Sequence, residues 1–100
     1  MIVIMGQGKV KPEARADMLA AAQRMSELSM AEDGCLDYRF WLSATDPNLV
    51  LLLEQWRDQA AIDAHFATPH LAEFGAAMGS ALDGEFDLKR LEVSSVGPLM

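Results

Sequence analysis

The chain has 100 residues, 51% of them hydrophobic, and its 15 acidic residues outnumber its 8 basic ones, for a formal charge of −7. This length fits one domain over residues 1–100. The basic residues are few and are scattered from Lys9 to Arg90 without a cluster. This distribution argues against a nucleic-acid binder and against binding to an anionic membrane surface.

Three further features lead us to expect a cytoplasmic protein. The only cysteine, Cys35, cannot form an internal disulfide, so nothing ties the chain to an oxidising compartment. The longest apolar runs, such as residues 49–53, are far too short to span a bilayer. The N-terminus has neither a charged residue ahead of its apolar residues nor a small-residue cleavage site, so we expect no signal peptide.

The first half of the chain predicts a strand, a helix and a second strand. Residues 1–11 are rich in β-branched side chains and contain Gly6 and Gly8, which predicts a strand with a bulge or a close approach at the glycines. A helix begins at Pro12, and Gly34 ends it. Residues 36–43 alternate as a strand does. The helix should bury a stripe of residues at helical spacing, namely Ala14, Met18, Ala21, Met25 and Leu28.

The second half predicts a strand, two short helices and a final strand. Residues 49–57 form the third strand, and because its first five residues do not alternate, both of its faces must be covered. Asp58 caps a helix that runs to Phe66, and Thr68 with Pro69 begins the next one. Gly84 ends that helix, and residues 85–96 form the last strand. The buried stripe of the later helix should be Leu71, Phe74, Met78 and Leu82.

This order of elements predicts the fold class. It is that of an α+β protein with the ferredoxin-like split βαβ arrangement, in which helices cover one face of an antiparallel sheet. The chain has too few helices and strands to cover the other face of the sheet as well. The third strand is nevertheless apolar on both sides. We therefore expect a homodimer, in which a second copy of the chain covers the bare face of the sheet.

Two stretches of the chain carry a resemblance to a known family. The first is Gly-Cys-Leu-Asp-Tyr at residues 34–38, and the second runs from Glu-Gln-Trp at residues 54–56 to His-Phe-Ala-Thr-Pro-His at residues 65–70. With these motifs, most of the chain resembles the antibiotic biosynthesis monooxygenase family. The resemblance implies a dimeric α+β barrel in which two sheets pack together.

The resemblance does not imply one reaction, because fold and function separate. Similar family members include cofactor-independent oxygenases that act on aromatic polyketides and quinols, haem-degrading enzymes and small-molecule isomerases. The haem-degrading branch uses an Asn on the first strand and a Trp and a His on helices. Here the first strand offers only Gln7, and Trp41 and Trp56 fall on predicted strands, which argues against haem degradation. The low basic content disfavours an isomerase of a phosphorylated metabolite.

The two histidines are the candidate bases. Oxygenation without a cofactor needs a base that makes the substrate anion, and a shaped apolar cavity. His65 is the preferred catalytic base because it lies on an otherwise apolar helix near Ile62 and Phe66. The alternative is a hydrogen-bonded histidine of the core or of a subunit contact. His70, near the start of the next helix, is the second candidate, and its alternative is an exposed first-turn residue.

Candidate substrate-binding residues lie on two predicted strands. Tyr38 is placed to hydrogen-bond a substrate oxygen and Trp56 to stack on an aromatic ring. Phe40 shares a strand face with Tyr38, and Glu54 shares one with Trp56. The alternative is that these aromatic residues only fill the core. A polar residue at the end of an apolar strand needs a partner, and the candidates for Glu54 are Arg39, Arg57 and a histidine.

We expect neither a cofactor nor a metal ion. The aspartates have no metal-binding spacing, and the two histidines do not form a His-x-x-x-His pattern. Cys35 has no base near it in the sequence, so it is most simply a small buried residue rather than a nucleophile.

The leading hypothesis is a cofactor-independent monooxygenase that oxidises a small aromatic phenol or quinol with O2. In this hypothesis His65 is the base, and Tyr38 and Trp56 orient the ring. The alternative is a non-catalytic dimeric module of the same fold, which binds a small molecule or serves in a stress response. Both need an apolar cavity, so residue spacing does not separate them.

Overall fold

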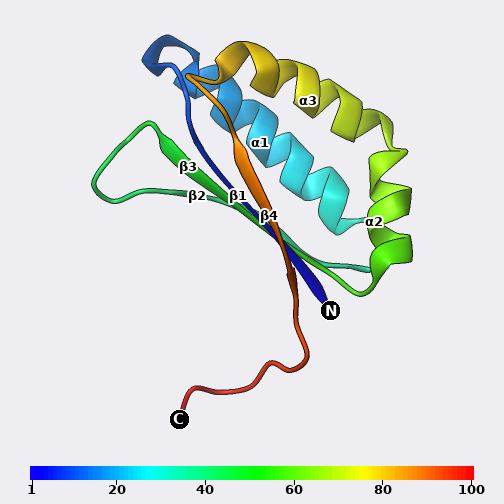
Figure 1. Cartoon of the computed structure of the whole chain (residues 1–100). Helices are drawn as coiled ribbons and strands as arrows, with labels where there is room; N and C mark the ends of the chain where they lie inside the picture. Colours follow the sequence, from blue (N-terminus) through cyan, green and yellow to red (C-terminus); the bar gives the residue numbers. More distant parts are fainter.

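The computed structural model describes residues 1–100, in which three α-helices cover one face of a four-stranded sheet (Figure 1). This arrangement confirms the predicted α+β ferredoxin-like fold. None of the helices is both long and apolar enough to cross a bilayer. In chain order the elements are β1 (Ile2–Lys9), a 3-10 turn (Pro12–Ala14), α1 (Arg15–Met30), β2 (Cys35–Leu42), β3 (Leu49–Trp56), α2 (Gln59–Phe66), α3 (Pro69–Ala81) and β4 (Asp87–Glu92).

The strands lie in the order β2-β3-β1-β4, and every neighbouring pair is antiparallel. β1 and β2 both run antiparallel to β3 and flank it, so they are parallel to each other and α1 connects them across the sheet. This is the split βαβ unit. β1 pairs with β3 from Ile2 opposite Trp56 to Lys9 opposite Leu49 without a register shift.

The glycines of β1 mark a close approach rather than a bulge. A Cβ at Gly8 would lie 2.6 Å from a ring carbon of Phe86, and a Cβ at Gly6 would also collide with that ring. Phe86 therefore folds over β1 only because both positions lack a side chain. The bulge lies in β2 instead, where Leu36 is the extra residue between Cys35 and Asp37. Because of the bulge, Leu36 leaves the buried face and is 55% exposed.

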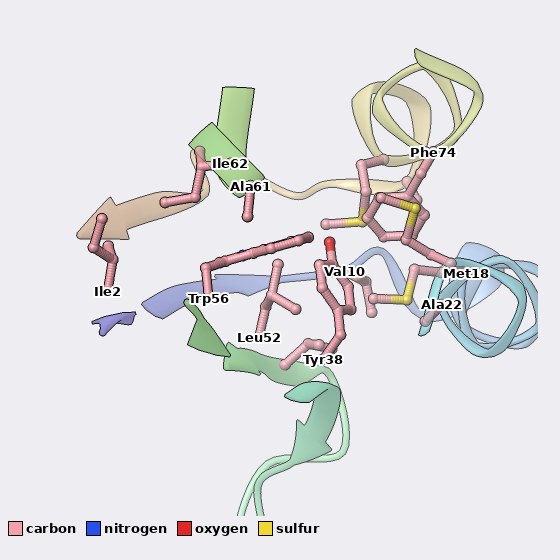
Figure 2. Packing of buried hydrophobic residues seen from close by; sticks show 14 residues of the cluster. Ile2, Val10, Met18, Ala22, Tyr38, Leu52, Trp56, Ala61, Ile62 and Phe74 are labelled. Atoms are coloured by element: carbon pink, nitrogen blue, oxygen red, sulfur yellow. The ribbon is translucent and has the colours of Figure 1, made fainter. Parts of the chain in front are cut away.

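The core lies between the sheet and the helices. Along β3 every second residue is buried under the helices, namely Val50, Leu52, Glu54 and Trp56. Figure 2 shows the Trp56 ring between the sheet and Ala61 and Ile62 of α2, with Tyr38 beside Leu52. Alternating burial on β3 means that Leu49, Leu51 and Leu53 point to the opposite, helix-free face.

The buried stripe of α1 differs in part from the prediction. Met18 and Met25 are buried as expected, but the remaining buried positions are Ala22 and Ser29 instead of Ala21 and Leu28. Residues three and four positions after a buried one both lie near the same helix face, so spacing alone did not choose between them. Packing against β2 and α3 decides the choice.

The caps predicted for the two later helices are confirmed. The Asp58 carboxylate accepts a hydrogen bond from the backbone N–H of Ala61 at 2.9 Å, and the Thr68 hydroxyl accepts one from Leu71 at 3.3 Å. In α3 the predicted residues Phe74 and Met78 are buried, together with Ala81. The predicted stripe residues Leu71 and Leu82 are half-buried at the two ends of that helix.

The last strand is shorter than the predicted span of residues 85–96. β4 ends at Glu92, opposite Ile2, the first residue of its only neighbour β1, and the last hydrogen bond along this edge runs from the Val93 N–H to the Met1 carbonyl at 3.0 Å. Residues 93–100 follow without regular structure and lead away from the body of the molecule (Figure 1).

Candidate functional site

A cavity of about 260 Å³ lies between the sheet, α2 and α3. Only a few polar side chains line it, from Tyr38, Glu54 and His65. An apolar recess with a small number of polar groups is the usual form of a small-molecule site. The apolar side chains around it come from β1, β3, both later helices and β4, and include Ile4, Leu52, Ile62, Phe74, Met78 and Leu88.

His65 lies in the last turn of α2 with its ring in the wall of this cavity. The residue is 1% exposed, and its ring lies against Trp56, with ring centroids 4.6 Å apart. Its Nδ1 lies 2.7 Å from Oε2 of Glu32, while Nε2 makes no hydrogen bond within the chain. Because a carboxylate only accepts hydrogen bonds, Nδ1 carries the proton and Nε2 keeps a free lone pair.

Glu32 is a site residue that the sequence analysis did not identify. It lies in the turn after α1, and the same Oε2 atom also accepts a hydrogen bond from Nε2 of His70, 2.8 Å away. The sequence offered Glu32 only as part of the Glu-Asp-Gly segment that ends a helix. No local signal pairs it with residues 33 and 38 positions further along, so only the fold shows this link.

The backbone holds this turn against α2. Gly34 has a φ of +84°, a left-handed conformation that favours glycine, and a Cβ there would lie 2.6 Å from Cβ of Ala61. The N–H of Arg57 also donates to the Gly34 carbonyl at 2.8 Å. These contacts place the Glu32 carboxylate beside the end of α2, where His65 lies.

The link between α2 and α3 fixes the two histidines relative to each other. The Thr68 hydroxyl donates to the His65 carbonyl at 2.7 Å and also accepts the cap hydrogen bond of α3. Pro69 then starts α3, and His70 is its second residue. His70 does not line the cavity but faces Glu32 from the other side, in the outer groove between α1 and α3.

Glu54 has a different partner from those expected. Its Oε1 accepts a hydrogen bond from the indole N–H of Trp56 at 2.9 Å, and neither arginine nor a histidine bonds to it. The pKa of Glu54 is raised to about 7, chiefly by burial; the Trp56 hydrogen bond opposes this rise, and the nearby Glu32 charge adds to it. Glu54 is therefore a carboxyl group inside the cavity that can change protonation near neutral pH.

The aromatic candidates divide into two groups. Tyr38 lines the cavity, its hydroxyl makes no hydrogen bond within the chain, and burial raises the pKa of its phenol, so the hydroxyl stays protonated. Trp56 is fully buried behind the cavity and contacts the cavity-lining residues Tyr38, Glu54 and His65. Phe40 packs against Phe74, with ring centroids 5.3 Å apart, and lies outside the cavity wall.

Cys35 has the character of a structural residue. Its thiol donates to the Asp37 carbonyl, with a sulfur-to-oxygen distance of 3.6 Å. Burial is the largest cause that raises the pKa of the thiol to about 11, and the charges of Glu32 and Glu54 add to it. Since the thiolate is the reactive form, this environment does not activate the cysteine.

Three comparisons with known proteins agree with this fold. Residues 1–77 match the sequence profile of a family described as antibiotic biosynthesis monooxygenase. A Bacillus subtilis protein named "Putative monooxygenase YcnE" is 36% identical over 94 residues, which make up 94% of this chain and 99% of that protein. The solved structure of Rv0793 from Mycobacterium tuberculosis superposes with a TM-score of 0.89 at 26% identity, over 97% of this chain and 98% of that chain.

An uncharacterised Synechocystis protein, sll1783, is 42% identical over 73 residues. The match takes up 73% of this chain but spans only half the length of that protein.

Proposed function

Because the chain belongs to the antibiotic biosynthesis monooxygenase family, we propose that it is a cofactor-independent monooxygenase that oxidises a small phenol or quinol with O2. The observation that carries this proposal is the position of His65. It is buried in the wall of an apolar cavity, and Glu32 binds its Nδ1 at 2.7 Å. The nitrogen left free, Nε2, is the base.

The first step is proton transfer from the substrate hydroxyl to Nε2 of His65. The imidazolium that forms is stabilised by the Glu32 carboxylate, which faces Nδ1. The resulting phenolate is electron-rich and reduces O2 directly. One oxygen atom of O2 becomes bonded to a ring carbon of the substrate. The other leaves as water with two hydrogens from the substrate. The substrate therefore supplies all the electrons, and no separate reductant is needed.

Two further side chains orient the substrate. The protonated hydroxyl of Tyr38 donates to a substrate oxygen, because it has no partner within the chain. Glu54, which Trp56 holds in place at 2.9 Å, provides a second polar contact on the cavity wall. Trp56 and Phe40 support this wall from behind rather than stacking on the substrate.

The size of the cavity narrows the substrate class. Pockets for drug-sized ligands measure about 300–1,000 Å³, whereas this cavity measures about 260 Å³. It is lined mainly by apolar side chains, and no arginine or lysine reaches it. Both properties favour an uncharged substrate of one or two rings over a large polyketide or a phosphorylated compound.

A homodimer is part of the proposal. The sheet face opposite the helices carries many apolar side chains, and two of the larger ones, Trp41 and Leu91, are 52% and 41% exposed. The other apolar residues of this bare face are Val3, Met5, Leu49, Leu51 and Leu53, and the polar residues Gln7, Arg39, Gln55 and Lys89 lie among them. Apolar side chains gathered on an uncovered sheet face favour an interaction site, and a second copy of the same sheet is the matching surface.

The test is oxygen uptake by metal-free protein with a panel of one- and two-ring hydroquinones and phenols. For a responsive substrate, we expect His65→Gln to lower kcat at least tenfold, because a positioned general base contributes about 10²–10⁴-fold. Glu32→Gln should lower it less, and Glu73→Gln, at an exposed carboxylate on α3, should leave it unchanged.

Two outcomes would contradict the proposal. If His65→Gln retains full uptake, His65 is not the base. If no substrate supports uptake although phenols bind the cavity, the chain is a non-catalytic binding module.

A further inference from the structure

Glu32, His65 and His70 form a cluster of three metal-ligating side chains on the far side of the His65 ring from the cavity. One donor atom from each lies within 4.8 Å of the others, and these atoms are Oε2, Nδ1 and Nε2 in that order. We propose that this cluster, the Glu32 cluster, is a binding site for a divalent transition-metal ion, with Zn²⁺ as the natural choice.

The donor set fits such an ion. Two neutral imidazoles and one carboxylate are ligands that Zn²⁺ and Co²⁺ prefer over Mg²⁺ and Ca²⁺, which take oxygen ligands. Both ring nitrogens point at one carboxylate oxygen, at 2.7 and 2.8 Å. Donor atoms around a tetrahedral zinc ion lie about 3.3 Å apart, from bond lengths of about 2.0–2.2 Å. The Glu32 oxygen therefore needs to retreat by roughly half an ångström, and the two histidine nitrogens, which lie up to 4.8 Å apart, need to approach each other by roughly 1.5 Å.

The fold organises the three ligands in advance. They come from the turn after α1, the end of α2 and the first turn of α3. Gly34 packs that turn against Ala61 of α2, and Thr68 fixes the link between the two helices. A metal ion that binds here orders little additional chain, so its affinity is not reduced by a large entropic cost.

The cluster opens towards solvent rather than towards the cavity. The side chains of Glu32 and His70 are 14% and 15% exposed, against 2% for His65. Glu32 also lines a surface depression beside Asp33 and Arg57. The Arg57 cation opposes a metal ion, but it is paired with Asp33 and Asp58. Water from this depression can supply the fourth ligand, as in zinc sites that have three protein ligands.

Metal binding would change the proton that faces the cavity. A metal ion on Nδ1 of His65 displaces the proton there, and the neutral ring then carries its proton on Nε2. The cavity-facing nitrogen becomes a donor and no longer accepts a proton. If His65 is the base of the proposed oxygenase, the metal ion is therefore an inhibitor rather than a cofactor. Only this consequence rests on the proposed function. The spacing of the histidines in the sequence does not reveal this site, because Glu32 joins them only in the fold.

The test is titration of chelator-treated protein with Co²⁺, monitored by visible absorption. We expect one equivalent to bind with the strong bands of four-coordinate cobalt, and Zn²⁺ to displace it. His70→Ala and Glu32→Gln should each weaken binding at least tenfold, whereas Glu73→Gln should not change it. Circular dichroism confirms that each variant is folded, and the partly exposed position of His70 makes its truncation mild.

A second measurement follows the proton itself. In ¹⁵N spectra of the histidine rings, Zn²⁺ should move the His65 proton from Nδ1 to Nε2. Absence of Co²⁺ binding, equal binding by His70→Ala, or an unchanged His65 tautomer with Zn²⁺ would each overturn the proposal. None of these readouts depends on turnover, so the metal site and the oxygenase activity can fail separately.

Discussion

At the scale of single residues, Glu54 couples protonation in the cavity to the stability of the fold. An unfolded carboxyl has a pKa near its ordinary value of 4.5, but burial raises the folded value to about 7. Between these values the folded chain holds a proton that the unfolded chain has released. Stability therefore falls as the pH rises from about 4.5 to about 7 and then levels off.

Glu54→Gln should remove this dependence while an amide oxygen still accepts the Trp56 hydrogen bond. Relative to this variant, we expect the wild-type protein to lose up to about 3 kcal/mol of unfolding free energy across that range. Urea unfolding of both proteins at pH 5 and pH 8 measures the difference. If the wild-type protein and the variant change by the same unfolding free energy between pH 5 and pH 8, Glu54 does not change its protonation in this range.

The candidate site could be predicted from the sequence only in part. The helical pattern and the family motif singled out His65, and strand alternation put Tyr38 and Glu54 on the face that lines the cavity. Alternation does not show depth, so it predicts a substrate contact for Trp56, which the structure buries fully behind the cavity. Glu32 could not be predicted for another reason: its partners, His65 and His70, are distant from it in the sequence.

At the scale of elements, the turn after α1 controls the position of Glu32. Gly34 combines a φ of +84° with close contact to Ala61 on α2. We expect Gly34→Ala to cost about 1–3 kcal/mol of stability, because the added methyl group forces the turn and α2 apart. The Glu32 carboxylate should then withdraw from His65, so oxygen uptake should fall as well.

Gly79→Ala is the matched control. Gly79 is an exposed residue of α3 with nothing within 4 Å of an added Cβ, so the same change should stabilise the protein by about 0.5–1 kcal/mol. Chemical unfolding of both variants makes the comparison. Equal effects at the two positions would show that the turn does not need glycine.

The boundaries of the helices and strands show which features local sequence patterns predict and which they do not. Side-chain caps such as Asp58 and Thr68 are local, so both helix starts were predicted correctly. The end of β4 depends on where its neighbour begins, and the extra residue Leu36 depends on the register with β3. Such features arise from pairing between distant segments, which local periodicity does not encode.

At the scale of the whole molecule, the bare face of the sheet predicts how two chains assemble. Leu51 lies near its centre, opposite Gln7 of β1 on one side and Trp41 of β2 on the other. In a homodimer this face is the interface, and stable interfaces of about 1,200–2,000 Å² bury such apolar centres. Light scattering at micromolar concentration should therefore give twice the 10.9 kDa mass of one chain.

Leu51→Asp should convert the dimer to a folded monomer, because a carboxylate on each copy would be buried against the other without a partner. Ala72→Asp, on the exposed face of α3, introduces the same charge away from the sheet and should remain dimeric. A wild-type monomer, or a Leu51→Asp dimer, would contradict this assembly. Because the cavity is built from one chain, ligand binding by the monomeric variant would further show whether the partner only covers the sheet or also supports the site.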